Sequence, residues 1–339
     1  MSAAPACAHS AQGPATSGSG RSLRVLAPIT VLACYLLVVS GDTVRVTESG
    51  MGCRSWPLCN GQVGLAGVYQ ALLEQSHRYA AAVVTVLVLA TFVLARRSAE
   101  RDRLAYRAAA AGVLLIGAQV VLGAITVFAH NAGWTVALHL AGAWLVLGAV
   151  TVTAVRVMPP AEPSGAPTLA QGLRPGRAPA LAAVAGVFLL SVSGMLVLDE
   201  GASWACPSWP LCPGSPDPLR LVLLQNAHRI IGFAATVAVV WAAVLLWRST
   251  PASSSRRLVA GGVLALLAAT GALGGIVATT GAPPYAQDLH LAVASAFWVG
   301  VVILAVVLGY APSPAPGLAA PDELPSAGGR ARSPGLAGG

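Results

Sequence analysis

The sequence contains no lysine and very little charge of either sign. Only 9% of its 339 residues are charged and 56% are apolar, and the mean hydropathy is +0.72. Because an ordinary soluble domain has about 25% charged residues, this composition excludes a soluble globular protein. The apolar segments also lack the alternation of apolar and polar residues that transmembrane strands show, which argues against an outer-membrane barrel. We therefore expect an all-α integral membrane protein.

Eight apolar runs are long enough to cross a bilayer as helices, each of which requires about 20 residues. They cover residues 24–41, 73–95, 106–128, 134–157, 179–198, 221–247, 258–279 and 288–310. The first run follows Arg21 and Arg24 and is bounded by Gly41 and Asp42, so we expect a retained helix rather than a cleaved signal peptide. The ends 1–21 and 311–339 are rich in Ala, Gly, Pro and Ser, and we predict that both are disordered tails.

The net charge of +8 comes from 20 arginines. If the N-terminus is cytoplasmic, 15 of them fall on the cytoplasmic side, and the outer side holds Arg45, Arg54, Arg78, Arg220 and Arg229. This asymmetry follows the positive-inside rule and predicts that both termini are cytoplasmic. The basic charge is explained by membrane orientation, so no nucleic-acid partner is needed.

The sequence is repeated internally. SWPLC occurs at 55–59 and at 208–212, and Ser40-Gly41 recurs as Ser193-Gly194, both at an offset of 153 residues. Two histidine motifs recur at an offset of 151 residues: His77-Arg78 as His228-Arg229, and His139-Leu140-Ala141 as His290-Leu291-Ala292. We predict two tandem, pseudo-symmetric four-helix bundles, 22–157 and 179–310, joined by a cytoplasmic linker at 158–178 that is rich in Pro and Gly.

Only six cysteines are present, and four of them lie in the repeated outer loops. An exterior compartment permits disulfides, so we expect Cys53 to pair with Cys59 and Cys206 with Cys212. Each pair could be a structural staple or a redox-active pair that relays electrons, and the sequence leaves both interpretations open. Cys34 lies within the first helix, where a small buried apolar role is the default.

Four of the six histidines occupy the repeated positions. The spacing from His77 to His139 equals that from His228 to His290, so each half has two histidines on helices of one bundle. Ionisable residues within membrane spans are expensive and usually functional. A pair of facing imidazoles is the arrangement that axial ligation of haem iron requires, whereas zinc or copper would need three or four ligands. His130 is unmatched and is interpreted as a loop residue.

The two halves differ beside the first histidine of each pair. EQSHR, Glu74 to Arg78, aligns with QNAHR, Gln225 to Arg229, so a carboxylate in the first half is replaced by an amide in the second. Glu74 shares a helix face with His77 and could donate or accept a proton, or stabilise positive charge on a substrate. We therefore expect chemistry in the first half and a held cofactor in the second. Arg78 and Arg229 could contact haem propionates.

The combination of these motifs resembles the haem A synthase family, in particular its bacterial branch with cysteine pairs in both outer loops. The resemblance rests on GxxxRxTxSGxGC in the first outer loop, Cys-x5-Cys ending in WPLC, ExxHR on the second helix, and single histidines on helices four, six and eight. It covers about residues 22–310 and implies an oxidoreductase of the bacterial plasma membrane that converts the C8 methyl group of haem O to a formyl group. The product, haem A, is used by cytochrome c oxidase.

The resemblance also implies residue roles. Glu74 corresponds to an essential acidic residue, with His77 and His139 beside the substrate haem, and His228 and His290 correspond to axial ligands of haem b. Cys53 and Cys59 correspond to a pair for which electron relay or haem delivery has been suggested, and the second pair looks more structural. The implied partners are haem O synthase, cytochrome c oxidase assembly, an electron-transfer partner that the sequence does not identify, the lipid bilayer and a second copy in a homo-oligomer.

Three other functions fit parts of the pattern. A bis-haem membrane electron carrier would use all four histidines, but its halves should be symmetric at Glu74 and Gln225. A quinone-linked disulfide oxidoreductase would use Cys53 and Cys59, but would leave four intramembrane histidines without a role. A haem transporter without chemistry is the third alternative.

Overall fold

The structure, a computed structural model, describes residues 17–64, 66–97, 102–158, 176–210, 212, 215–250 and 254–309. This part of the chain is helical apart from its loops. It forms one short 3-10 helix, η1 (Ala202–Trp204), and the long helices α1 (Ser17–Val46), α2 (Tyr69–Arg97), α3 (Arg103–Phe128), α4 (Gly133–Val157), α5 (Arg177–Asp199), α6 (Leu219–Arg248), α7 (Ser255–Thr279) and α8 (Pro284–Gly309).

All eight long helices are apolar enough to cross a membrane. Their candidate spans contain 23 to 30 residues, and at 1.5 Å per residue even the shortest matches a hydrocarbon core of about 30 Å. The prediction of eight membrane helices is confirmed. The predicted tail 1–21 overlaps the start of α1, while residues 1–16, 159–175 and 311–339 of the predicted tails and linker lie outside the described residues.

Polar side chains cap two of the helices. Asp102 accepts a hydrogen bond from the Ala105 backbone N–H at the start of α3 and forms an ion pair with Arg156 of α4. Ser254 accepts a hydrogen bond from the Arg256 backbone N–H at the start of α7. Such caps satisfy backbone donors that have no partner within the helix.

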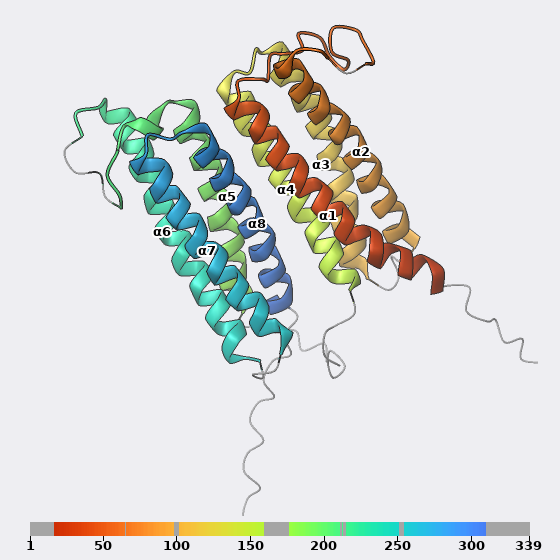
Figure 1. Cartoon of the computed structure of the whole chain (residues 1–339). Coiled ribbons are helices and arrows are strands. Elements are labelled where there is room, and N and C mark those ends of the chain that lie inside the picture. Colours follow the sequence, from red (N-terminus) through yellow and green to blue (C-terminus); the bar gives the residue numbers. More distant parts are fainter. Residues whose placement is uncertain are drawn as a thin grey trace, which may run out of the picture.

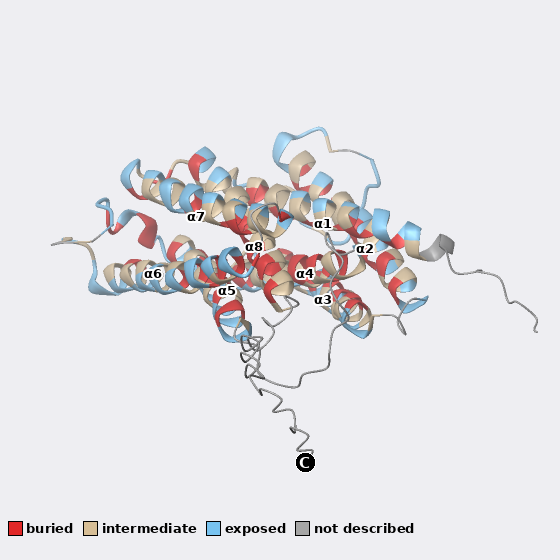
Figure 2. Ribbon diagram, turned by 90° about the horizontal axis from the view of Figure 1, so that it is seen from below, coloured by how far each residue is buried: buried red, intermediate tan, exposed pale blue. Residues whose placement is uncertain are grey.

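The helices lie in two groups, α1–α4 and α5–α8, side by side (Figure 1). Between the groups, α8 contacts α1 and α4, and α4 also contacts α5. The share of buried residues in the apolar span is 44% for both α4 and α8 but only 17% for α7. Figure 2 shows α4 and α8 at the centre of the molecule. The remaining helices expose large apolar side chains, as expected for surfaces that face lipid.

Aromatic packing joins the two groups in the apolar core. Trp144 of α4 stacks on Trp298 of α8 with ring centroids 5.7 Å apart, and both side chains are almost fully buried. The indole Nε1–H of Trp298 donates a hydrogen bond of 2.8 Å to the Trp144 carbonyl. This contact satisfies the polar atom of a tryptophan that is otherwise in apolar surroundings.

A polar contact joins the groups nearer one end, which we call the loop end because both cysteine-paired loops lie there. Thr43 of α1 donates to the carboxylate of Asp288 on α8 at 3.1 Å. Arg45 donates to Asp42 at 2.6 Å and to the Gln287 side-chain oxygen at 3.3 Å. Two side-chain contacts, Thr43 with Asp288 and Arg45 with Gln287, therefore connect α1 to the start of α8 at this end.

Candidate functional site

Each of the two cysteine-paired loops at the loop end is closed by a disulfide. Cys53 is bonded to Cys59 with their Cα atoms 4.7 Å apart, and Cys206 to Cys212 with their Cα atoms 5.4 Å apart. Both pairings agree with the sequence prediction. The free cysteine among the described residues is Cys34, which is buried on α1.

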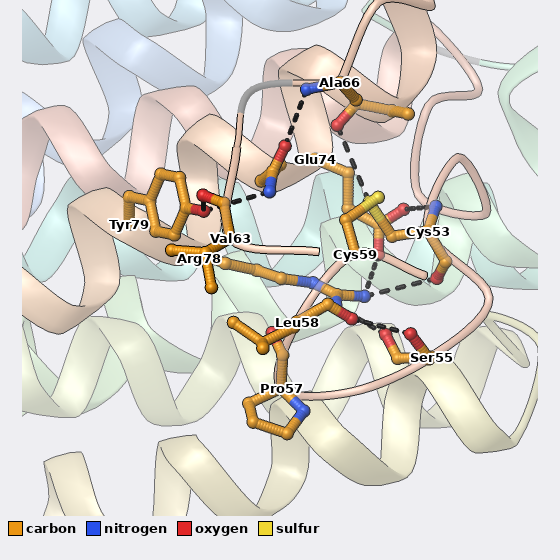
Figure 3. The surroundings of a disulfide bond; sticks show 12 residues. Cys53, Ser55, Pro57, Leu58, Cys59, Val63, Ala66, Glu74, Arg78 and Tyr79 are labelled. Atoms are coloured by element: carbon orange, nitrogen blue, oxygen red, sulfur yellow. Dashed lines mark hydrogen bonds and ion pairs between the residues drawn. A yellow bond between two sulfur atoms is a disulfide. The ribbon is translucent and has the colours of Figure 1, made fainter. Parts of the chain in front are cut away.

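Glu74 and Arg78, one turn apart on α2, hold the first loop. The backbone N–H of Cys53 donates to the Glu74 carboxylate at 2.7 Å, and the carboxylate also forms an ion pair with Arg78. Figure 3 shows the guanidinium of Arg78 pointing toward the loop backbone, where it donates to the carbonyls of Ser55 at 2.6 Å and of Cys53 and Pro57 at 3.3 Å. The buried carboxylate of Glu74 thus links α2, the disulfide loop and a cation.

Arg229 holds the second loop in a similar way. It donates to the carbonyls of Cys206 at 3.1 Å and Pro210 at 3.2 Å. The position matching Glu74 is Gln225, which is also buried but carries no charge to pair with Arg229. The structure therefore places both arginines on loop carbonyls. The contacts of Arg78 and Arg229 with haem propionates stay a prediction. Each guanidinium has five N–H donors, so it can bind loop carbonyls and a propionate at the same time.

Two of the candidate histidines are oriented by a serine on the preceding helix. The Ser40 hydroxyl lies 2.9 Å from His77 Nδ1 and 2.9 Å from the Leu37 carbonyl. Because a carbonyl can only accept, the hydroxyl proton is directed to Leu37 and the serine oxygen accepts from the Nδ1–H of His77. This tautomer leaves Nε2 unprotonated, which is the state in which an imidazole binds a metal ion.

The second half repeats this contact. Ser193 Oγ lies 2.9 Å from His228 Nδ1 and 2.8 Å from the Leu190 carbonyl. Since the same argument applies, His228 also presents an unprotonated Nε2. The repeat of Ser40-Gly41 as Ser193-Gly194 was visible in the sequence, although its role as a hydrogen-bond acceptor depends on the packing of α1 on α2 and of α5 on α6.

Each candidate histidine also packs against a glycine of the helix that precedes its own. A Cβ atom built on the glycine would lie 3.0 to 3.4 Å from the imidazole Cε1, and the pairs are Gly41 with His77, Gly123 with His139, Gly194 with His228 and Gly274 with His290. These distances are tighter than ordinary contacts, so a larger residue would displace the ring. The four glycines therefore let the imidazoles lie close to a neighbouring backbone.

The structure places the two histidines of each helix group near the loop end of their helices, with His77 on α2 and His139 on α4, and with His228 on α6 and His290 on α8. His77 and His139 lie close enough to interact electrostatically, and so do His228 and His290. All four side chains are half-buried within long apolar helices, and Nδ1 of His139 and of His290 is buried without a hydrogen-bond partner among the described residues. Within that part of the chain, no three His, Cys, Asp or Glu side chains cluster as a metal site. Two imidazoles per half suit a macrocyclic metal centre coordinated from both faces.

His130 is not part of either pair. It lies in the turn between α3 and α4 with a φ of 53°, as the sequence predicts for a loop residue. His9 lies outside the described residues. Sequence reasoning missed Gly123 and Gly274 as partners of histidines, although their equal offset of 151 residues could have indicated them.

The fold defines a class of multi-pass membrane protein in which each of the two helix groups carries two histidines on its long apolar helices. The sequence profile of the COX15-CtaA family, described as cytochrome oxidase assembly protein, matches residues 66–302. The chain belongs to this family. Its described residues contain eight candidate membrane spans, and together with its bacterial relatives this makes it a multi-pass protein of a bacterial cell membrane.

Two similar proteins from bacteria are both named heme A synthase. The chain is similar to the heme A synthase of Geobacillus thermodenitrificans, with 30% identity over 232 residues that cover 66% of this chain and 71% of the relative. It is also similar to the heme A synthase of Lysinibacillus sphaericus, with 26% identity over 245 residues, or 70% of this chain and 78% of the relative.

Proposed function

We propose that this protein is a haem A synthase, an oxidoreductase that converts the C8 methyl group of haem O to a formyl group. The observation that carries the proposal is the pairing of two histidines in each half of a chain whose relatives bear this name. Converting a methyl to a formyl group is a four-electron oxidation. If water supplies the oxygen atom, the methyl group and one water molecule give the formyl group, four protons and four electrons. With that source of oxygen, the protein would bind a haem substrate and pass four electrons to an acceptor.

We assign the substrate haem to the first half, between His77 and His139. Glu74 supports this assignment because it adds a carboxylate near His77 that the second half lacks. Its carboxylate could accept a proton or stabilise positive charge that develops on the substrate. The hydrogen bond from Cys53 and the ion pair with Arg78 fix its position on α2.

We assign haem b to the second half, where His228 and His290 would hold its iron. When bound, haem b would supply one-electron transfer. Ser193 supports the assignment because it holds His228 in the tautomer whose Nε2 is free to bind iron. In the first half Ser40 does the same for His77.

The domain organisation and orientation are part of the same proposal. The halves would be residues 22–157 and 179–310 with linker 158–178, and the loop end would face the outside of the cell. The recurrence of the serine, glycine and arginine contacts in both halves supports the tandem arrangement. Haem O synthase, cytochrome c oxidase assembly and an electron-transfer partner are the expected partners, together with a second copy of this chain.

A purely electron-carrying cytochrome is less well supported. It would need two equivalent sites, but Glu74 in the first half is replaced by Gln225 in the second. A quinone-linked disulfide oxidoreductase would leave the serine-oriented histidines without a role.

The proposal is tested by expressing the full chain in cells that supply haem O and analysing extracted haems by chromatography and mass spectrometry. We expect haem A, or its hydroxylated precursor, in the presence of the protein and neither in its absence. Bound haem b without any oxidised haem O product would contradict the synthase function and favour the carrier.

The role of Glu74 is tested by Glu74→Gln, which makes the first half resemble the second. An amide oxygen can still accept from Cys53 but cannot pair as a charge with Arg78, so the loop contact is largely kept while the carboxylate chemistry is lost. We expect haem A formation to fall at least about a hundredfold with haem b still bound. Haem A production at the parental rate would remove Glu74 from the mechanism.

A further inference from the structure

Gln119 is a buried amide in the apolar part of α3. Its side chain is 7% exposed, and its Oε1 atom has no hydrogen-bond partner among the described residues. An amide oxygen without a partner in the hydrocarbon region costs several kcal/mol. A polar group kept there at that cost points to a ligand that satisfies it.

The position of Gln119 connects it to the first-half site. Gly123, one turn along the same face of α3, lies against the His139 imidazole. Gly142, three residues after His139 on α4, lies so close to the Gln119 amide that a Cβ built on it would be 1.9 Å from Nε2. The amide therefore lies along the face of α4 that carries His139, one turn farther from the loop end.

Helix geometry gives the distance of Gln119 and of His139 from the loop end. Gln119 precedes the end of α3 by nine residues and His139 follows the start of α4 by six, which at 1.5 Å per residue places them about 14 Å and about 9 Å from the loop end of their helices. The amide is therefore deeper in the bundle than the imidazole to which we assign the substrate iron.

The second half has no equivalent group. At the offset of 151 residues, Gln119 corresponds to Thr270 and Gly142 to Val293. The Thr270 hydroxyl is already bonded to the Leu266 carbonyl at 2.8 Å, and Val293 has a side chain in place of the space that Gly142 leaves. The unpartnered amide and the glycine that accommodates it occur together and only in the half assigned to the substrate.

We propose that Gln119 is a specificity-determining residue that hydrogen-bonds a hydroxyl group of the substrate haem, the one on its isoprenoid side chain. This inference rests on the proposed function. The two propionates of a haem favour the wet loop end, so the opposite edge of the macrocycle, which carries the hydroxylated isoprenoid substituent in haem O, points deeper into the bundle. Haem b lacks this hydroxyl, so Gln119 would distinguish substrate from cofactor.

The test is a binding experiment on the full chain, purified with haem b in its second half. Haem O and haem b are each titrated into the wild-type protein and into Gln119→Leu, and affinity is measured from the absorbance change. We expect Gln119→Leu to weaken haem O binding roughly tenfold, because one buried hydrogen bond is lost, and to leave haem b binding unchanged. Thr126→Val on the same helix, which removes a hydroxyl bonded within α3, is the matched control and should leave both affinities unchanged.

A second variant tests the proposal independently in case Gln119→Leu does not fold. Gly142→Ala keeps the amide but forces it out of its position, and we expect the same selective loss of haem O affinity, with retained second-half haem b reporting correct folding. Unchanged haem O affinity in both variants would overturn the proposal. Accumulation of a C8-hydroxylated haem with unchanged haem O affinity would also overturn it, because the amide would then bind the newly formed hydroxyl. If the wild-type protein itself neither binds nor oxidises haem O, the proposed function fails instead.

Discussion

Ser193 places a single hydroxyl oxygen 2.9 Å from Nδ1 of His228. Because the hydroxyl donates its own proton to the Leu190 carbonyl, its oxygen accepts from Nδ1–H of the imidazole. A hydrogen bond from Nδ1–H makes the imidazole a stronger ligand, especially for ferric iron. We predict that Ser193→Ala lowers ferric haem b affinity about tenfold and raises the midpoint potential by up to about 59 mV, since a tenfold change in a one-electron equilibrium corresponds to that shift.

Spectroelectrochemistry of the purified protein measures this shift. Ser193→Thr keeps a hydroxyl and should restore the potential. The control Ser191→Ala removes a hydroxyl on the same helix that donates to the Val187 carbonyl, and it should leave the potential unchanged. An unchanged potential in Ser193→Ala would show that the serine does not orient His228.

Gly274 occupies a position where the packing of α7 against His290 leaves little room for a larger side chain. A Cβ on Gly274 would lie 3.2 Å from His290 Cε1, whereas a Cβ on Gly262 of the same helix would meet nothing within 4 Å. We predict that Gly274→Ala reduces haem b occupancy several-fold, because a ring held by iron cannot move aside. Gly262→Ala should keep full occupancy and gain up to about 1 kcal/mol of helix stability.

Haem content per polypeptide, determined from absorbance and protein assay, separates the two glycine variants. Equal haem content in both would mean that the imidazole of His290 has room to shift.

At the level of helices, the sequence predicts the number of membrane helices and their approximate positions, but it does not predict the residues at which they begin and end. The first apolar run stops at residue 41, yet α1 continues to Val46. Asp42 and Arg45 pair across one turn, and the hydroxyls of Thr43 and of Thr47, the residue after the helix end, donate to backbone carbonyls of α1. The length of the apolar run corresponds to the thickness of the hydrocarbon core. The helix itself extends beyond the core where its polar side chains form hydrogen bonds or ion pairs with one another.

The candidate site shows a similar division. The histidine pairs followed from a repeated spacing, and so did both disulfides. The contacts of Arg78 and Arg229 did not, because they depend on loop carbonyls whose direction no spacing encodes. Gln119 was missed for another reason: a single amide in an apolar run has no periodic signal, and its significance depends on Gly142 across the helix interface.

In the whole molecule, Trp298 joins the two halves. It stacks on Trp144, donates to its carbonyl and lies beside Phe188. We predict that Trp298→Ala destabilises the protein by about 3–5 kcal/mol through cavity formation and loosens the packing of α4 on α8. Thermal unfolding in detergent should show a clearly lower midpoint, whereas Trp241→Ala, at a side chain that is 56% exposed, should shift the midpoint little. A small effect of Trp298→Ala would mean that the halves are held mainly by other contacts.

The central claim is that the halves divide the work, with substrate haem in the first and haem b in the second. The most direct test compares two double variants of the full chain, His77→Ala with His139→Ala and His228→Ala with His290→Ala, by mass spectrometry of the haems that each retains after purification. We predict that the first double variant loses haem O and haem A but keeps haem b, and that the second loses haem b. Loss of haem b from the first double variant, or equal loss of every haem from both, would contradict the account.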